Sequence, residues 1–297
     1  MEVGKLADRG GVEVRGLDLA APPTPGENEA LNALFEEHGL VVFRDQQLTK
    51  QQLVDAGIRF GGSVLRKPLV ADDPEALGIS VLSNRGYDGT VIPNDPNEKV
   101  GEAPWHTDQG YLPNPNRGKI LYCVQAPEEG GMTGFVDGYA AYDALSAEMK
   151  SRIEELHVVQ SWGKLQRRTD GQDFRLDGKR EMEKARFADV LFPIVYPHPV
   201  SGRKVLNFPP MWAAGIAEMA GPEGEALTQA LIEHITQPKL QYWHRYALGD
   251  AVLWDNWRFL HKAGGTPGRY ARTIWSITLN SGPQIGRVAG NGQSEAI

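Results

Sequence analysis

Short apolar runs alternate with turn residues along much of the chain. The first clear unit is HGLVVFRDQQLTKQQLVDAGIRFGG, in which an apolar, β-branched run is followed by a turn and then by a helical pattern. Thr49 and Gln52 have the spacing of a helix capping box, and Gly61 and Gly62 supply a stop signal. The segment therefore predicts a strand followed by a helix.

From residue 119 onward the apolar runs are short and are separated by turns, which predicts a mainly β fold of sandwich or barrel type. A helical pattern covers 140–156, and residues 84–104 are dense in Gly, Pro, Asn and Asp and predict a long loop. The charged stretch 171–190 is typical of a solvated helix or loop, with a lid over the site as the alternative. The predicted strands are KILYCVQAP, MTGFVD, GRKVLNF, DAVLWDN and YARTIWSITL.

The chain contains no internal repeat, no low-complexity tract and no clear interdomain linker. A chain of 297 residues is long enough to bury a substantial core. We therefore expect one domain over residues 1–297, with an insertion around 162–192 as a candidate lid.

Charge and cysteine content narrow the classes of function. A net charge of -7 argues against nucleic acid or an anionic membrane as the main partner and favours a small molecule. The single cysteine, Cys123, excludes an intrachain disulfide and a cysteine-rich metal site, and its apolar neighbours predict a buried, inert thiol. Neither a signal peptide nor a run of about 18 apolar residues is found, so we expect a soluble, cytoplasmic protein. The oligomeric state stays open, a homo-oligomer included.

Candidate chemistry begins with the stretch APWHTDQGY, where His106 and Asp108 lie two positions apart. If residues 105–109 are extended, both side chains lie on one face, whereas on a helix they would diverge by roughly 200°. The preceding loop and the following strands favour the extended form. A non-haem iron site with two histidines and one carboxylate then needs one more histidine from elsewhere in the chain.

His261 is the best candidate for that third ligand, because it follows the run DAVLWDNWRFL and precedes the turn-rich KAGGTPG. In the next strand, alternation puts Arg272 and Ser276 on one face of an otherwise apolar segment. An arginine there is costly to bury unless an anion, such as a bound carboxylate, accompanies it. The other histidines have structural interpretations: His38 near a helix end, His157 and His234 on helices, His198 in a turn, and His244 packed in a strand.

Taken in order, five segments resemble the Fe(II)- and 2-oxoglutarate-dependent dioxygenases of the taurine dioxygenase and 2,4-dichlorophenoxyacetate dioxygenase family. These segments are HGLVVFRDQQLT, WHTDQGY, EEGGMTGFVD, HPVSGRKVLNF and LWDNWRFLHKAGGTPGRYAR, and they span most of the chain. The resemblance implies a mainly β fold with flanking helices around a double-stranded β-helix, the jelly-roll core also found in cupins.

By the same resemblance, His106, Asp108 and His261 would be the catalytic iron ligands. Thr133 would contact a carboxylate of 2-oxoglutarate, and Arg272 would pair with its C5 carboxylate. The implied reaction uses O2 to convert 2-oxoglutarate to succinate and CO2 while a substrate C–H bond is hydroxylated. Related halogenases lack the carboxylate ligand, so the presence of Asp108 disfavours halogenation.

Two departures concern the substrate. Taurine dioxygenase-like enzymes commonly carry a second arginine four positions after the first, where this chain has Ser276, and an amide four positions before the first ligand, where it has Glu102. Both changes disfavour a sulfonate and favour a neutral or amine-bearing substrate, although Glu102 could also be an exposed loop carboxylate. The candidate substrate residues are Glu102, Gln109, Tyr111, Phe208, Met211, Trp212 and Ser276, and the aromatic and Met members could equally be core.

Two other classes of protein remain open at this point. A zinc hydrolase could use the same three ligands, but Thr133 and Arg272 would then be unexplained. A cupin-like binding protein would need neither an open iron face nor a co-substrate pocket. The residues do not name the primary substrate, the carbon attacked, or whether hydroxylation leads on to desaturation or cleavage.

Overall fold

The computed structural model describes residues 1–7, 10–61, 78–85, 95–162, 187–280 and 282–290. The chain divides into two compact units. The first comprises Met1–Pro104, Asn116–Asp137 and Gln241–Ser281, and the second comprises Trp105–Pro115, Gly138–Leu240 and Gly282–Ile297. None of the described helices is long and apolar enough to cross a membrane.

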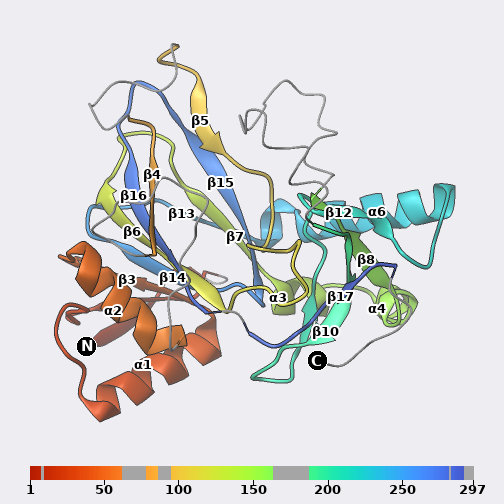
Figure 1. Ribbon diagram of the computed structural model, residues 1–297, viewed down its shortest axis with the longest axis horizontal. Coiled ribbons are helices and arrows are strands. Elements are labelled where there is room, and N and C mark those ends of the chain that lie inside the picture. Colours follow the sequence, from red (N-terminus) through yellow and green to blue (C-terminus); the bar gives the residue numbers. More distant parts are fainter. Residues whose placement is uncertain (8–9, 62–77, 86–94, 163–186, 281, 291–297) are drawn as a thin grey trace. The chain divides into compact units, whose positions relative to one another are not determined.

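Among its described residues, the first unit contains two β-sheets and two helices (Figure 1). The larger sheet has the strand order β1-β2-β3-β14-β6-β16-β4, and the smaller has the order β13-β7-β15-β5. Neighbouring strands are antiparallel except β2 and β3, which run parallel. The elements are β1 (Glu2–Lys5), β2 (Val12–Arg15), α1 (Pro25–His38), β3 (Leu40–Phe43), α2 (Lys50–Gly61), β4 (Ile79–Ser83), β5 (Lys99–Glu102), β6 (Gly118–Gln125), β7 (Thr133–Asp137), β13 (Gln241–His244), β14 (Ala251–Asp255), β15 (Phe259–Pro267) and β16 (Thr273–Thr278).

The central strands of the larger sheet, such as β3 and β14, are buried on both faces. In β14, Ala251 and Leu253 pack in the core that includes helices α1 and α2, while Val252 and Trp254 pack in a second core with Phe135 and Phe259 of the smaller sheet. Alternation along a strand sends successive side chains to opposite faces, so a continuous apolar run such as AVLW suits this central strand. The second core is the layer between the two sheets of this unit, and we call it the inter-sheet layer.

Local signals set the helix ends in this unit. The predicted capping box at the start of α2 is confirmed: the Thr49 backbone N–H donates to Gln52 Oε1 at 2.8 Å, and the Gln52 N–H donates to Thr49 Oγ1 at 3.3 Å. Thr24 and Glu27 form a second capping box on α1, and Gly39 ends that helix in the left-handed conformation.

The second unit contains a four-stranded sheet of order β12-β8-β9-β17, a two-stranded hairpin and several helices. Tyr139, Tyr196 and Val205 form one of its buried clusters. Its elements are α3 (Gly138–Asp143), α4 (Ala147–Ile153), β8 (His157–Gln160), β9 (Val190–Pro193), β10 (Val195–Pro197), β11 (Lys204–Leu206), β12 (Ala213–Ile216), α6 (Pro222–Ile235), a 3-10 turn (Pro238–Leu240) and β17 (Arg287–Val288).

Three local predictions need correction. Residues 84–104 are not loop throughout, because β5 forms there by pairing with β15. The helix predicted over 140–156 divides into α3 and α4, since Ser146 caps a new helix start by accepting from the Met149 N–H. His157 lies on β8 rather than on a helix. Of the stretch 171–190, only 187–190 is described, so the predicted lid lies largely outside the described residues.

The mainly β architecture with helices and several sheets agrees with the prediction. Among the histidines given structural interpretations, His38 ends α1, His234 lies on α6 and His244 lies on β13, as expected. The turn predicted at His198 is confirmed as the connection between β10 and β11, where the Gly202 N–H donates to the His198 carbonyl at 2.9 Å.

Candidate functional site

His106 and Asp108 come together at a turn in the second unit. Their Nε2 and Oδ1 atoms are 3.9 Å apart, and the two side chains are 13% and 15% exposed. The extended form predicted through residue 109 is wrong in its last part, because Gln109 has a φ of 57° and the Leu112 N–H donates to its carbonyl at 2.8 Å. The chain therefore turns from Asp108 onward, and the turn, rather than strand alternation alone, sets the direction of the carboxylate.

Residues 211 and 212 of the same unit hold this segment by two hydrogen bonds to its backbone carbonyls. Trp212 donates its indole N–H to the Thr107 carbonyl at 2.8 Å, and the Met211 N–H donates to the Trp105 carbonyl at 3.0 Å. Thr107 lies between the two candidate ligands, so its carbonyl contact restrains both of them.

His261 lies on β15 in the first unit and is 5% exposed. It is opposite Phe135 of β7 in the register, and its ring centroid is 4.7 Å from that of Trp254, so the imidazole lies in the inter-sheet layer. His106, Asp108 and His261 each offer one ligand atom that could hold a metal ion. Two imidazoles and one carboxylate form the donor set of a non-haem iron site, so the group suits that metal.

Arg272 is a partly buried cation that forms no ion pair with a carboxylate among the described residues. Its Nε donates to the Gly131 carbonyl at 3.2 Å, and its guanidinium carbon lies 5.6 Å from the centre of the Tyr246 ring. Burial lowers the pKa of this guanidinium. Gly131 has a φ of 68°, and a Cβ there would lie 2.9 Å from Arg272 Cδ, so a glycine is needed for this approach. Such a cation suits a bound anion.

Thr133 is 3% exposed at the start of β7, and its Oγ1 lies 3.0 Å from the phenolic oxygen of Tyr246. Thr133 is opposite Ala263 of β15, whereas His261 is opposite Phe135. Thr133 and His261 therefore occupy adjacent rows on the inner face of the smaller sheet. Tyr246 joins this group from outside any predicted motif, and no local pattern in the sequence signals it.

The two departures from the family pattern lie in different environments. Ser276 is 2% exposed on β16 and is opposite Leu121, which packs in the inter-sheet layer. Glu102 lies opposite Gly264 on β5, with its carboxylate 3.8 Å from Lys262 Nζ. Since Lys262 follows His261 in a strand, the Glu102 and Lys262 pair lies on the face of β15 opposite to the His261 ring.

An aromatic cluster in the second unit adjoins the turn that carries Asp108. Tyr111 contacts Trp212 with a centroid distance of 5.2 Å, and Trp162 and Phe187, which sequence reasoning did not select, complete the cluster. Of the other candidate substrate residues in this unit, Phe208 is fully buried and Met211 is partly buried.

Gln160 is a further polar residue that the sequence did not single out. It is 1% exposed, and no hydrogen bond is formed by its Oε1 atom within the described chain. A Cβ at Gly110 would lie 2.5 Å from that atom, which puts the amide directly against the Asp108 turn. The Gln109 Oε1 atom is likewise buried without a partner among the described residues.

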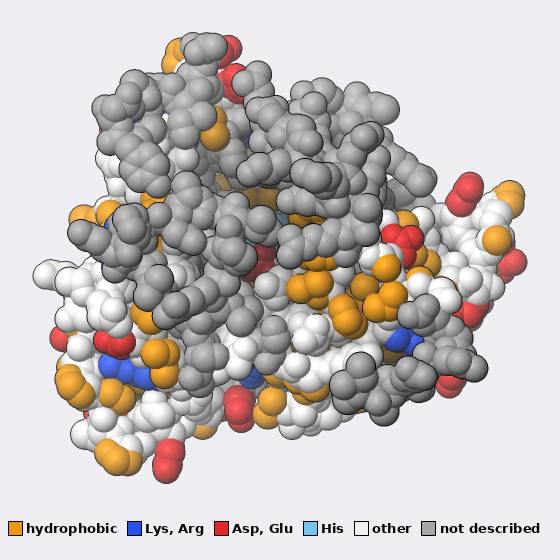
Figure 2. Space-filling view, in the orientation of Figure 1, with side chains coloured by type: hydrophobic (Ala, Val, Ile, Leu, Met, Phe, Trp, Pro, Cys, Tyr) orange, Lys and Arg blue, Asp and Glu red, His pale blue; other side chains and the backbone are white. Residues whose placement is uncertain are grey.

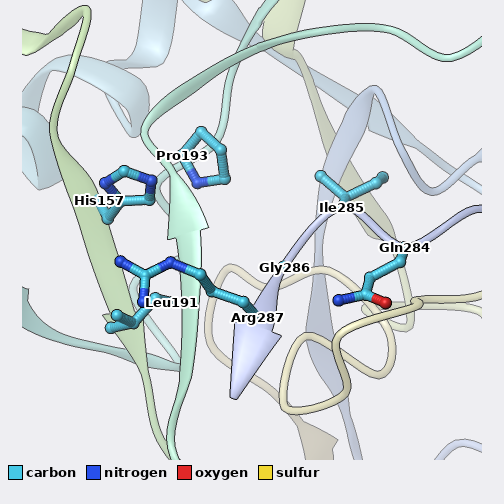
Figure 3. A pocket seen from close by; sticks show the side chains of 7 residues that line it. All are labelled: His157, Leu191, Pro193, Gln284, Ile285, Gly286 and Arg287. Atoms are coloured by element: carbon cyan, nitrogen blue, oxygen red, sulfur yellow. The ribbon is translucent and has the colours of Figure 1, made fainter. Parts of the chain in front are cut away.

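A separate pocket of about 280 Å³ lies in the second unit (Figure 3). Arg287 of β17 extends its guanidinium toward His157 of β8, over Leu191. None of the predicted site residues lines this pocket, and His157 is already bound to Glu218 at 2.8 Å. On the face shown in Figure 2, the described Lys and Arg side chains form no broad patch, which agrees with the net charge of -7.

Comparison with known proteins identifies the family. The family model for the taurine catabolism dioxygenase TauD, TfdA family, matches residues 2–278. The chain is 33% identical to an (S)-phenoxypropionate/alpha-ketoglutarate-dioxygenase of Sphingobium herbicidovorans, over 96% of this chain and 93% of the relative. It is 30% identical to an alpha-ketoglutarate-dependent 2,4-dichlorophenoxyacetate dioxygenase of Cupriavidus pinatubonensis, over 84% and 87% of the two chains.

A solved structure supports the same assignment. The crystal structure of AAD-2 in complex with Mn(II) and N-oxalylglycine matches with a TM-score of 0.79 and 30% identity, over 96% of this chain and 99% of that one. The match sets aside the zinc hydrolase and the cupin-like binding protein. The chain belongs to the TauD/TfdA family and is an alpha-ketoglutarate-dependent dioxygenase.

Proposed function

We propose that the protein is an Fe(II)- and 2-oxoglutarate-dependent hydroxylase of a small organic substrate. His106, Asp108 and His261 hold the metal, and Arg272 and Thr133 hold the co-substrate. The observation that carries the proposal is the partly buried Arg272, which has no carboxylate partner among the described residues and borders the inter-sheet layer, where it lies over Tyr246 and where His261 contacts Trp254. The core of the first unit is proposed to be the double-stranded β-helix of this family.

Arg272 recognises a carboxylate by its planar fork of donors and by its charge. Two parallel N–H groups match the two oxygens, and burial strengthens the attraction because little water screens it. The anion in turn removes the cost of a buried, uncompensated guanidinium. Thr133 adds a hydroxyl donor in the row next to His261, so one carboxylate of a dicarboxylic acid is fixed on the strands that carry this ligand.

The metal ligands have a complementary task. Three protein donors leave coordination positions for a chelating 2-oxo acid and for dioxygen. When bound, Fe(II) supplies the chemistry in which O2 and 2-oxoglutarate give succinate and CO2 while a substrate C–H becomes C–OH. Trp212 holds the Thr107 carbonyl and thereby restrains the backbone between His106 and Asp108.

The substrate is proposed not to be a sulfonate. A buried anion needs a cation, and Ser276 stands where similar taurine dioxygenases carry a second arginine. Gln160 supplies an acceptor oxygen that lacks a partner among the described residues, and a donor group on a neutral or amine-bearing substrate would satisfy it. Glu102 gives weaker support for excluding a sulfonate, because its carboxylate is paired with Lys262.

Oxygen consumption and succinate release test the proposed function. The protein is freed of metal with a chelator, reloaded with Fe(II) or Zn(II), and given 2-oxoglutarate with phenoxyalkanoates, amino acids, amines or sulfonates. We expect Fe(II)-dependent succinate release that at least one non-sulfonate compound stimulates. Turnover that is equal with Zn(II), or that requires no 2-oxoglutarate, would contradict the proposal.

A further inference from the structure

We infer that Tyr246 is a positioning residue that directs the Thr133 hydroxyl proton toward the carboxylate bound by Arg272. The inference rests on the proposed function, since that carboxylate belongs to 2-oxoglutarate. It assigns to Tyr246 a role that acts through Thr133 rather than by contact with the metal.

The direction of the hydrogen bond between Tyr246 and Thr133 follows from the number of protons on the two hydroxyls and from their strength as donors. The Tyr246 and Thr133 oxygens are 3.0 Å apart, and each group carries one proton. No second hydrogen bond is formed by either hydroxyl among the described residues. A phenol is the stronger donor of the two, so Tyr246 donates to Thr133 Oγ1, and the Thr133 proton is left for a further acceptor. That acceptor is the anion beside Arg272.

Burial keeps Tyr246 in the protonated form that this arrangement needs. A phenol is protonated at neutral pH, and burial raises the pKa of Tyr246 further, to about 12, so the hydroxyl remains a donor even beside Arg272. A phenolate here would also neutralise Arg272, whose guanidinium carbon lies 5.6 Å from the ring centre. Because the phenol stays neutral, the charge of Arg272 remains for the carboxylate.

A buried polar network restrains the Tyr246 ring. The His244 ring meets it edge-on, with centroids 4.7 Å apart and planes at 89°. His244 Nε2 lies 3.1 Å from Asp250 Oδ2, and that carboxylate oxygen also accepts from Arg44 at 2.7 Å and from the Ala247 N–H at 2.9 Å. Both ends of the short segment after β13 are therefore held. His244 is also opposite Thr133 in the β13 and β7 register, so the two hydroxyls are aligned by the same pair of strands.

A double-mutant cycle tests whether Tyr246 acts through Thr133. The variants are Tyr246→Phe, Thr133→Val and their combination, each loaded with Mn(II). Calorimetry measures how tightly each variant binds N-oxalylglycine, an analogue of 2-oxoglutarate that carries the same two terminal carboxylates. Net loss of one hydrogen bond predicts about threefold to tenfold weaker binding for each single variant. The combined variant is expected to bind no more weakly than Thr133→Val, because the phenol then has no hydroxyl to direct.

Tyr122→Phe is the matched control. Tyr122 is also a buried tyrosine, and its hydroxyl joins the Gln46 carbonyl and the Leu48 N–H, each at 3.1 Å, on the other face of the larger sheet. We expect this change to lower the melting temperature without changing N-oxalylglycine affinity. Melting curves of all variants separate loss of folding from loss of positioning.

The outcomes distinguish the inference from the proposed function. The inference about Tyr246 would be overturned by unchanged N-oxalylglycine affinity in Tyr246→Phe. It would also be overturned if the losses of affinity in the two single variants multiplied in the combined variant. Either result would leave the proposed function intact. If the unmodified Mn(II)-loaded protein does not bind N-oxalylglycine, the proposed function fails, and the inference fails with it.

Discussion

Trp212 donates its indole N–H to the carbonyl of Thr107, at 2.8 Å, and so reaches the backbone between the two candidate ligands His106 and Asp108. Replacement by phenylalanine retains an aromatic ring beside Tyr111 but removes the donor. We expect Trp212→Phe to weaken metal binding by about tenfold, because loss of one hydrogen bond costs about 1 kcal/mol and frees the ligand-bearing backbone. Titration of the metal-free protein with Mn(II) measures this.

Trp243→Phe is the control for that change. Trp243 makes an equivalent indole bond, to Gln241 Oε1 at 2.8 Å, at a site remote in sequence from the ligand-bearing turn. Equal metal affinities in the two variants would mean that Trp212 serves folding rather than the ligands.

Loss of any one candidate ligand is expected to abolish turnover. His106→Ala, Asp108→Ala and His261→Ala each leave only two protein donors, which do not hold the metal in a defined geometry. The fold should persist, which melting temperature checks, and bound iron is measured directly. Near-normal turnover in a variant that still contains iron would remove that residue from the ligand set.

Arg272→Lys should raise the 2-oxoglutarate concentration needed for half-maximal rate, while iron binding is retained. A point charge replaces a bidentate fork, at a cost of about 1–3 kcal/mol, or roughly tenfold to a hundredfold in affinity. Arg269→Lys is the matched control, because Arg269 pairs with Glu129 at an exposed position. The two variants should differ clearly, and equal dependence on 2-oxoglutarate would assign Arg272 to structure.

Taurine and other small sulfonates are expected to be poor substrates. Ser276 offers no charge to a sulfonate, and a buried anion without a cation is strongly disfavoured. A competition assay of taurine against amino acids, amines and phenoxyalkanoates tests this, followed by Ser276→Arg with its melting temperature measured. Efficient taurine turnover by the unmodified protein would refute the prediction, whereas sulfonate binding gained only in Ser276→Arg would support it.

Gly11 and Gly16 distinguish two reasons why a position requires glycine: a positive φ, and a lack of space for a Cβ. Both have positive φ, of 78° and 66°. A Cβ at Gly11 would lie 2.1 Å from the Leu40 carbonyl oxygen, whereas a Cβ at Gly16 would have no described residue within 4 Å except its two chain neighbours. We expect Gly16→Ala to lower the free energy of unfolding by about 1 kcal/mol, from backbone strain alone. Gly11→Ala should cost clearly more, because β3 backbone must move. Urea unfolding of both variants gives the difference, and equal losses would show that the overlap relaxes freely.

Features that depend on nearby residues could be read from the sequence. The capping box of Thr49 and Gln52 works within one helical turn, so its spacing is sufficient to predict the start of α2. The strands β6, β14 and β16 follow from apolar runs between turn residues. Alternation within β16 likewise predicted that Ser276 shares a face with Ile274, which packs in the inter-sheet layer.

Other features depend on which strands become neighbours, and only the tertiary structure decided them. Glu102 lies in a segment with loop composition, yet β5 forms there because it pairs with β15. This pairing brings the Glu102 carboxylate within 3.8 Å of Lys262 Nζ. The contact between Tyr246 and Thr133 joins residues far apart in the chain, and it depends on the register of β13 against β7. Local spacing and flanking turns made His106, Asp108, His261 and Arg272 candidates, and the resemblance to the family gave them their expected roles. The partners of those residues come from other strands through hydrogen-bonded register and packing, which no local pattern encodes.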